Sequence, residues 1–188
     1  YEKKSFNINP IIGKYDDPSM QQQHLLTIPI SDKGNTLIYG VAGSGKENLI
    51  STMIYSSMLY YHPNELNYYI IDFGSEALRV FKNCPLVGDI LYSDDTDKIS
   101  NLFKMLSSTI DSRKKLFADY NGDYQNYCKN SGKTVPNIVV VINNYEAYQE
   151  TFPEYDDQLI ILSREGVKYG IYFVIATVTP NGLRFKLK

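Results

Sequence analysis

The chain has 188 residues, 43% hydrophobic and 21% charged, a composition that suits one folded globular domain with a single sizeable core. Its 19 basic and 21 acidic residues give a formal net charge of −2, which argues against a broad nucleic-acid-binding face, because such faces carry a basic excess. The sequence has no signal peptide and no apolar run of the roughly 20 residues that cross a bilayer. It begins at Tyr1 rather than Met, so we expect an excised domain of a larger protein.

Short apolar alternations and turn residues fill the first 34 positions. Within them, residues 25–30 (LLTIPI) predict an edge strand, since Pro29 cannot donate to a strand ladder. From residue 35 onward, strands and helices alternate, which is typical of a parallel sheet built from strand–helix–strand units. We expect one domain over 1–188, with an approach segment of about 1–34 and a core of about 35–188.

The predicted elements of the core differ in their apolar pattern. Helices show apolar residues at steps of three and four, whereas strands are rich in β-branched residues. In chain order they are a buried strand (35–39), a helix (46–61), a strand (66–73), a short helix (76–81), a strand into a loop (89–95), a long helix starting at Asp94 or Asp95, a central strand (138–142), a helix (156–168), a strand (170–177) and a final edge strand (182–188).

A glycine-rich loop lies between the first strand and the first helix of this core. The stretch YGVAGSGKENLI (39–50) fits the phosphate-binding pattern G-x-x-x-x-G-K-[ST] at every position except the last, where Glu47 replaces the hydroxyl residue. Backbone N–H groups and the helix N-terminus favour phosphate at such a loop, and Lys46 supplies a positive charge. The candidate nucleotide-binding residues are Gly40, Val41, Ala42, Gly43, Ser44, Gly45, Lys46 and Glu47. The alternative is a glycine-containing loop before an ordinary helix.

Glu47 is unfavourable beside a triphosphate. At about 5 Å and an effective dielectric of about 20, it would cost roughly 3 kcal/mol per phosphate charge before screening. A carboxylate is a possible ligand of Mg²⁺, but Glu is longer than Ser, so its oxygen would not lie where the hydroxyl does. As a purely structural residue, an acid in the first helical turn is favourable. We therefore expect ATP and Mg²⁺ to bind weakly, if they bind at all.

The strand over 138–142 ends in two asparagines at the position where such nucleotide hydrolases place an acid. Asn143 and Asn144 keep hydrogen-bonding groups but lose the charge that organises Mg²⁺, and an amide is no general base. Glu146 lies two residues further on and is expected to point elsewhere. The alternative is a simple Asn-Asn turn after a strand. Together with Glu47, these substitutions indicate an ATPase scaffold without its catalytic groups.

Four stretches resemble the FtsK/SpoIIIE family of ATPase domains: IYGVAGSGKENLI, YYIIDFGSEAL, IVVVINNYEAY and REGVKYGIYFVIATVTP. They follow the family's order, and the resemblance extends over the whole chain. The resemblance implies an α/β fold, a RecA-like three-layer P-loop architecture with a mostly parallel central sheet flanked by helices. It also implies that Thr177 is a phosphate sensor. The approach segment resembles that of type VII secretion ATPases, and the degenerate loop and the ending ATVTPNGLRFKL resemble the C-terminal, third ATPase module of such motor proteins.

This resemblance implies a set of partners and a location. The parent would be a membrane-anchored protein with several ATPase modules in tandem on the cytoplasmic face of the cell membrane. It would export WXG100-type or other type VII substrates and is a possible hexamer. DNA translocation is disfavoured by the net charge and by Val178-Thr179, where DNA pumps often have Gln-Arg. Arg113 and Arg164 are candidates for an arginine finger, although either can equally be structural.

Several tyrosine-rich segments are candidates for a docking surface. They are YYHP (60–63), YNGDYQNY (120–127) and NYEAY (144–148). Tyrosine gives large contact area at a small entropic cost, so a short helical signal can bind such a surface. The alternative is that these rings cover helix ends and pack within the domain.

Three functions compete at this point. The first is a degenerate ATPase-like module for substrate recognition and regulation of secretion. The second is an active ATPase in which Glu47 ligates Mg²⁺ and a neighbouring subunit supplies missing groups. The third, a small P-loop kinase or GTPase, lacks support, because we find no guanine-specificity motif and no lid segment.

Overall fold

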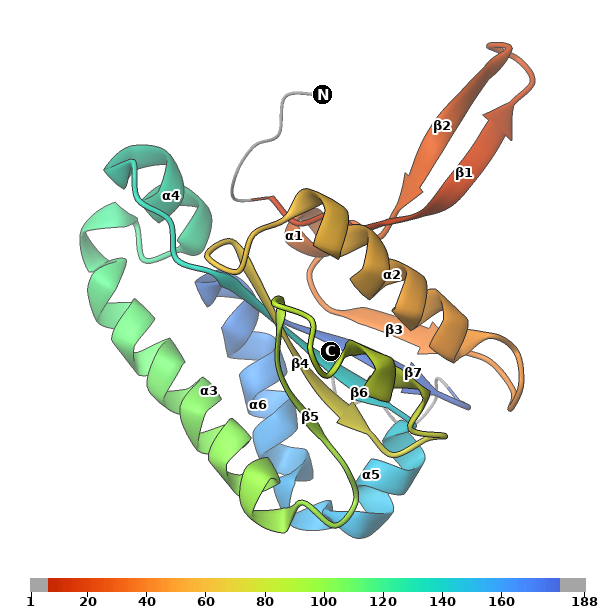
Figure 1. The fold of residues 1–188 in the computed structure, drawn as a ribbon. Coiled ribbons are helices and arrows are strands. Elements are labelled where there is room, and N and C mark those ends of the chain that lie inside the picture. The colour runs from red at the N-terminus through yellow and green to blue at the C-terminus, as the bar shows by residue number, and fades with distance from the viewer. Residues whose placement is uncertain (1–6, 180–188) are drawn as a thin grey trace.

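The computed structural model describes residues 7–179 and contains two sheets. The main sheet has five parallel strands in the order β3-β7-β6-β4-β5, and a separate antiparallel hairpin pairs β1 with β2 (Figure 1). The predicted RecA-like α/β fold is therefore confirmed. The strands are β1 (Ile11–Asp17), β2 (Gln22–Thr27), β3 (Thr36–Tyr39), β4 (Leu66–Asp72), β5 (Val87–Leu91), β6 (Asn137–Asn143) and β7 (Ile171–Thr177).

Helices cover both faces of the main sheet. Helix α2 packs on one face, and α3, α5 and α6 lie on the other, so the molecule has three layers (Figure 1). The helices are α1 (Ile30–Lys33), α2 (Lys46–Tyr60), α3 (Thr96–Leu116), α4 (Tyr124–Ser131), α5 (Tyr145–Thr151) and α6 (Asp156–Gly166), with a 3₁₀ turn η1 (Ala77–Phe81). Within residues 7–179, no helix is both long enough and apolar enough to span a membrane.

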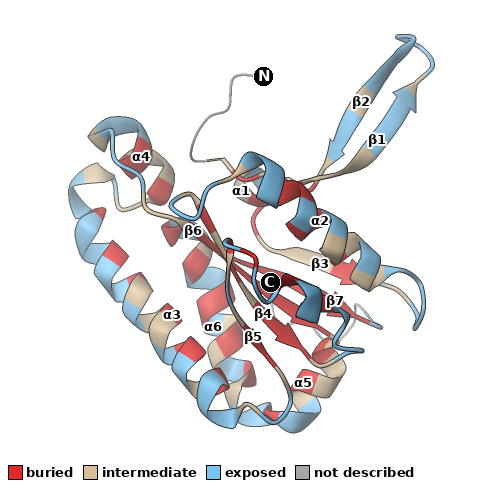
Figure 2. Ribbon diagram, in the orientation of Figure 1, coloured by how far each residue is buried: buried red, intermediate tan, exposed pale blue. Residues whose placement is uncertain are grey.

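Strand β6 is the centre of the sheet, as predicted. Every residue of β6 and of its neighbour β7 is buried (Figure 2). Alternate side chains point to opposite faces of a strand. Val140 and Ile142 accordingly join the core under α3 and α6, whereas Val139 and Val141 join the core under α2.

Helix α3 buries the predicted stripe. Its apolar members are all in the core, and Phe117 follows directly after the helix. Arg113 is also buried on this stripe, where its guanidinium donates to the backbone carbonyls of Tyr169 (2.6 Å) and Pro136 (2.5 Å). A buried guanidinium must be hydrogen-bonded, and these carbonyls meet that need. The arginine-finger hypothesis for Arg113 is therefore wrong, whereas Arg164 is exposed on α6.

The N-terminal predictions need correction. Of the predicted edge strand over 25–30, residues 25–27 belong to β2, which pairs with β1 in the separate hairpin, whereas Pro29 directly precedes the short helix α1. Strand β3 is less buried than predicted, since it lies at the edge of the described sheet and only Ile38 is buried.

Three helices, α1, α4 and α5, were not predicted, and the last two bury tyrosines that were considered as docking residues. Helix α4 begins after Asp123, whose carboxylate accepts a hydrogen bond from the backbone N–H of Asn126 at 2.7 Å, and α5 begins after Asn144. The docking hypothesis is wrong for the buried rings of these helices, which are Tyr124, Tyr127, Tyr145 and Tyr148. The predicted strand over 182–188 lies outside the described residues.

Gly170 gives a test of this packing. It has φ +73°, and a Cβ there would lie 2.6 Å from the ring of Tyr124. Gly132 has a similar φ of +66° but open space around it. We expect Gly132→Ala to lower the free energy of unfolding by about 1–2 kcal/mol through its left-handed backbone. Gly170→Ala should cost a further 1–3 kcal/mol, roughly the range for overpacking. Urea unfolding of both variants checks this, and equal losses would contradict the packing described.

Candidate nucleotide site

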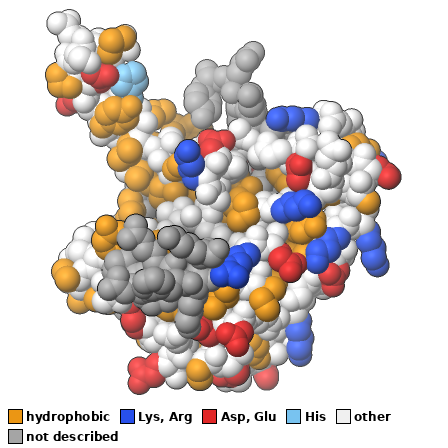
Figure 3. Space-filling model, turned by 180° about the vertical axis from the view of Figure 1, so that it is seen from behind, with side chains coloured by type: hydrophobic (Ala, Val, Ile, Leu, Met, Phe, Trp, Pro, Cys, Tyr) orange, Lys and Arg blue, Asp and Glu red, His pale blue; other side chains and the backbone are white. Residues whose placement is uncertain are grey.

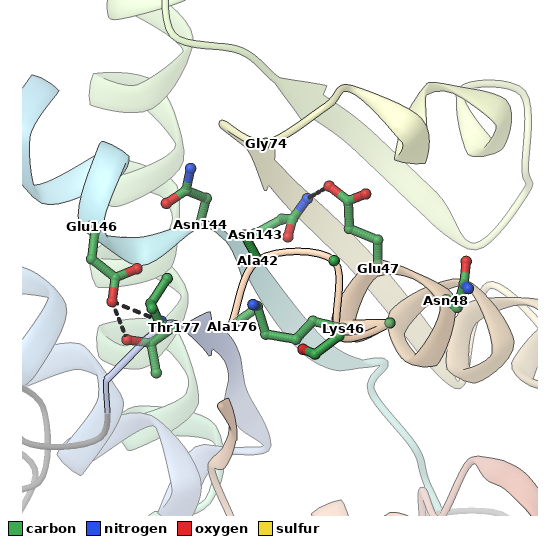
Figure 4. A pocket seen from close by; sticks show the side chains of 14 residues that line it. Ala42, Lys46, Glu47, Asn48, Gly74, Asn143, Asn144, Glu146, Ala176 and Thr177 are labelled. Atoms are coloured by element: carbon green, nitrogen blue, oxygen red, sulfur yellow. Dashed lines mark hydrogen bonds between the residues drawn. The ribbon is translucent and has the colours of Figure 1, made fainter. Parts of the chain in front are cut away.

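The carboxyl ends of parallel strands meet at one edge of the sheet, where ligands bind in open α/β folds. Here that edge and the glycine loop enclose a cavity of about 360 Å³ (Figure 4). Most predicted site residues line it, whereas Gly40 and Val41 do not. The lining residues are Ala42, Gly43, Ser44, Gly45, Lys46, Glu47, Asn48, Gly74, Asn143, Asn144, Glu146, Ala176, Thr177 and Val178.

The glycine loop has the tight path that its sequence predicts. Gly43 (φ +74°) and Gly45 (φ +89°) adopt left-handed backbone, and Gly45 caps α2. Gly40, at the start of the loop, does not have a positive φ. Glycine is needed there for a different reason, because a Cβ would lie 2.5 Å from the hydroxyl oxygen of Ser44.

The ammonium group of Lys46 is bound to its own loop. Its Nζ donates to the carbonyl oxygens of Gly40 (2.5 Å) and Val41 (3.0 Å). The one lysine of the loop is thus hydrogen-bonded within the protein, and a phosphate would have to compete with two carbonyls for it.

The amide of Asn143 joins two carboxylates. Its Nδ2 donates to Glu47 Oε1 and to Asp72 Oδ1, each at 2.9 Å. Because an ionised carboxylate only accepts hydrogen bonds, the amide must direct its nitrogen, which carries two hydrogens, toward both carboxylates. We call this arrangement Asp72–Asn143–Glu47 the amide bridge. It connects β4, β6 and the start of α2.

Neighbouring groups complete the hydrogen bonds of the amide bridge. Glu47 also accepts from the hydroxyl of Ser75 (2.8 Å) and from its backbone N–H (3.2 Å). Asp72, which is 1% exposed, accepts from the N–H groups of Gly74 and Leu78. A Cβ at Gly74 would lie 2.6 Å from Glu47 Oε1, so glycine at this position leaves room for the bridge.

These hydrogen bonds change the acidity of Glu47. The donor amide of Asn143 is the largest cause that lowers its pKa, and Ser75 adds to this, while burial opposes it. A carboxylate whose pKa is lowered in the folded state stabilises the fold above its unfolded pKa of about 4.3, and this stabilisation is lost as pH falls through the folded value. Glu47 is therefore ionised at neutral pH.

Asn144 has a local structural role. It adopts left-handed backbone (φ +67°), which Asn tolerates better than most residues. Its Oδ1 accepts from the N–H of Ala147 at 3.3 Å and caps α5, and its Nδ2 donates to the carbonyl of Phe73. These bonds match the simple turn that the sequence left open.

Glu146 was expected to point elsewhere, and this is wrong. Its carboxylate lines the cavity and binds the end of β7 (Figure 4). Glu146 Oε1 lies 2.5 Å from the hydroxyl oxygen of Thr177 and accepts from the N–H of Val178 at 2.8 Å and from Thr179 at 3.4 Å. Burial raises the pKa of Glu146, but these donors outweigh it and the pKa is lowered. The predicted phosphate sensor thus already contacts an anionic group of its own chain.

The family follows from the sequence profile that covers this site. The profile of the FtsK/SpoIIIE family matches residues 6–179. The chain belongs to the FtsK/SpoIIIE family. An ESX secretion system protein EccC from Geobacillus thermodenitrificans is 32% identical over 174 residues, which are 92% of this chain and 12% of that protein. The chain thus spans about one eighth of that relative.

Solved structures agree with this assignment. EssC (ATPases 2 and 3) from the same Geobacillus species has a TM-score of 0.86 at 30% identity, over 100% of this chain and 36% of that one. Thermomonospora curvata EccC (ATPases 2 and 3), in complex with a signal sequence peptide, has a TM-score of 0.84 at 22% identity, over 100% and 36%, and supports the fold alone. The predicted resemblance to type VII secretion ATPases is confirmed.

Membership of the FtsK/SpoIIIE family implies that a nucleotide and Mg²⁺ bind at this site. The residues present fit the phosphates of a nucleotide better than they fit the metal ion. The glycine loop has the shape that cradles phosphate. The metal side of the site does not fit, because both nearby carboxylates accept hydrogen bonds from the amide of Asn143. Across residues 7–179, no group of three or more His, Cys, Asp or Glu side chains is placed to hold a metal ion.

The amide bridge predicts the effect of an acid at position 143. Asn143→Asp would place three carboxylates together, and like charges about 4 Å apart at an effective dielectric of about 20 repel by roughly 4 kcal/mol. We expect a loss of at least about 2 kcal/mol of unfolding free energy at pH 7, which shrinks as pH falls toward about 4.3, because mutual repulsion raises the pKa of one carboxyl in the folded state and it takes up a proton there first.

Asn144→Asp is the matched control for this experiment. It makes the same chemical change one residue along, away from the two carboxylates, and keeps the cap on α5. Urea unfolding of both variants across pH checks the prediction. Equal, pH-independent losses at the two positions would contradict the bridge.

Proposed function

We propose that this chain is a degenerate ATPase-like module of a type VII secretion motor, which serves substrate recognition and regulation of export with weak or no ATP hydrolysis. The observation that carries this proposal is the amide bridge. The side chains at the positions that would organise Mg²⁺ in an active site, Glu47, Asp72 and Asn143, are here hydrogen-bonded to one another.

The chemistry of the cavity supports the same proposal. Two ionised carboxylates, Glu47 and Glu146, line it together with one lysine, and Lys46 is hydrogen-bonded to loop carbonyls. This charge balance opposes a polyphosphate. An amide at 144 cannot take a proton from water. ATP and Mg²⁺ remain weak ligands at most in this proposal.

The module would be one of several in a longer chain. The relative and the solved structures reported above support this placement, since each is longer than this chain and the structures hold ATPases 2 and 3. We propose that residues 1–188 are the third module, preceded by other ATPase modules, in a membrane-anchored, hexameric parent. The module would then lie on the cytoplasmic face of the cell membrane.

A recognition role needs an exposed apolar surface, and α2 has one. Its inner side buries Ile50, Met53 and Ile54, yet its outer side also exposes apolar residues at helical spacing, Tyr55 and Leu59 among them. Amphipathic segments bind such stripes. A signal segment of a WXG100-type or other type VII substrate is the partner we propose, in line with the peptide complex of the related EccC. No nucleic-acid partner is proposed.

One observation favours the second candidate, an active motor ATPase. Glu146 is a carboxylate in the cavity wall, and its Oε2 has no hydrogen-bond partner among the described residues. A carboxylate at this place is a possible general base. Its lowered pKa makes it a weak one, which is why this candidate stands second.

Steady-state hydrolysis tests the proposed function. The module should turn over ATP far below an ordinary rate of about 1 s⁻¹. The triple variant Glu47→Ser, Asn143→Asp and Asn144→Glu should bind MgATP more tightly than the parent, because it restores the metal ligands without crowding three carboxylates. Adding Lys46→Ala to the triple variant is the control and should abolish that gain.

A turnover of about 1 s⁻¹ or more by the unchanged module would overturn the proposal. If the Glu146→Gln variant also loses that turnover, the active motor ATPase becomes the proposed function in place of the degenerate module.

A further inference from the structure

The β1–β2 hairpin projects away from the rest of the molecule (Figure 1). Seen from behind, hydrophobic side chains gather along the hairpin and continue to its junction with the body (Figure 3). Four large ones are strongly exposed: Tyr15 (50%), Met20 (62%), Leu25 (46%) and Leu26 (44%). Exposed apolar residues that cluster on one projecting element indicate an interaction site.

Each face of the hairpin exposes a leucine: Leu26 shares its face with Tyr15, and Leu25 lies beside the polar Lys14, Asp16 and Gln23. Leu25 and Leu26 are consecutive in β2, so their side chains point to opposite faces. A single two-stranded hairpin is marginally stable alone in water. The body of the domain can contact at most one face of the hairpin. It covers neither Leu25 nor Leu26, because both lie in the part of the hairpin that projects from the body. A partner that contacts both faces would remove this exposure.

The hairpin is preformed. At its tip, Asp17 accepts from the backbone N–H of Ser19 at 3.0 Å and from its hydroxyl at 2.5 Å, which fixes the turn. Across the strands, the rings of Tyr15 and His24 lie 5.4 Å apart. A binding element that is already ordered loses little conformational entropy when it docks.

The root of the hairpin is anchored to the core. The backbone N–H of Asn9 donates to the hydroxyl of Tyr61 at 3.0 Å, next to the end of α2, and that of Ile8 donates to Ser31 at 2.6 Å. After β2, the N–H of Ile28 donates to the carbonyl of Pro10 at 2.9 Å. The hairpin therefore has a fixed direction relative to the nucleotide cavity and its sheet.

The occupant that fits best is a neighbouring ATPase module. The family profile includes the hairpin, since it matches from residue 6, so the hairpin is part of the module rather than a linker. In the Geobacillus EssC structure, this chain covers 36% of a polypeptide that holds two ATPase units. A tethered module has an effective concentration of roughly millimolar, which favours it over a second copy.

We propose that the β1–β2 hairpin is a preformed docking arm that contacts the preceding ATPase module of the same polypeptide on both of its faces. This inference rests on the tandem arrangement in the proposed function. It assigns to residues 11–27 the role of setting the position of this module against its neighbour.

Photocrosslinking in the full parent polypeptide tests the arm. A benzoylphenylalanine is placed at Leu25 or at Leu26, one for each face, and crosslinked peptides are identified by mass spectrometry. The control position is Ile161, which is more exposed than either leucine, at 55%, but lies on α6. We expect both hairpin positions to crosslink to the preceding ATPase module at least tenfold more than position 161.

A mixture of isotopically light and heavy protein separates contacts within one chain from contacts between copies. Crosslinks that join light to heavy protein, crosslinks to any other segment, or yields equal to those at 161 would each overturn the arm.

The two proposals can fail separately. Nucleotide hydrolysis bears on the degenerate site and leaves the crosslinks unaffected. A parent sequence without a preceding ATPase module would remove both the tandem placement and the arm. Absent crosslinks in a parent that has such a module would remove the arm alone.

Discussion

One side chain, the amide of Asn143, holds together three of the elements that line the cavity. Its nitrogen donates to Glu47 on α2 and to Asp72 on β4, and it is itself at the end of the central strand β6. Because Asn143 is 3% and Asp72 1% exposed, the bond between them lies away from bulk water, and the bond to Glu47 is partly buried. The start of α2, directly after the glycine loop, is thus joined to the end of the central strand.

The two substitutions at 47 and 143 explain each other. With a carboxylate on the helix, a second acid at the end of β6 would meet both Glu47 and Asp72, and without a cation three such groups repel. An amide at 143 turns that repulsion into two hydrogen bonds. The acid expected at position 143 of β6 is an amide, and α2 carries a carboxylate at position 47 in place of a hydroxyl. A direct hydrogen bond therefore joins strand and helix where a metal ion would be expected to link them.

The other polar groups of the cavity follow the same principle. Lys46 is bound to loop carbonyls, Asn144 caps α5, and Glu146 accepts from Thr177 and the backbone beyond it. Each group that would meet phosphate, metal or water in an active enzyme has a partner within the chain. Such a site is stable without a ligand, which suits a module whose surfaces carry its function.

The sequence predicted those parts of the molecule that depend on local pattern. The central strand, the stripe of α3 and the glycine loop all rest on spacing within a short segment, and the structure has them. Glu146 was missed because its orientation depends on β7, which lies some 30 residues further along the chain. The tyrosines of α4 and α5 were misjudged because both helices are short and mostly polar, so their sequences show no clear apolar stripe. Only tertiary packing shows which face of each helix is buried. The hairpin was missed because the composition of β1 and β2 does not indicate that the two segments pair with each other.

The most direct test of the account is calorimetric titration of the domain with ATP, once with excess Mg²⁺ and once with a chelator. In an intact site the metal joins nucleotide to protein, so it strengthens binding. If the amide bridge has replaced the metal, the affinity for ATP should be the same within about threefold in both titrations, or too weak to measure in either. A tenfold or greater gain with Mg²⁺, about 1.4 kcal/mol, would show that Glu47 or Asp72 leaves Asn143 to ligate the metal, and would contradict the account.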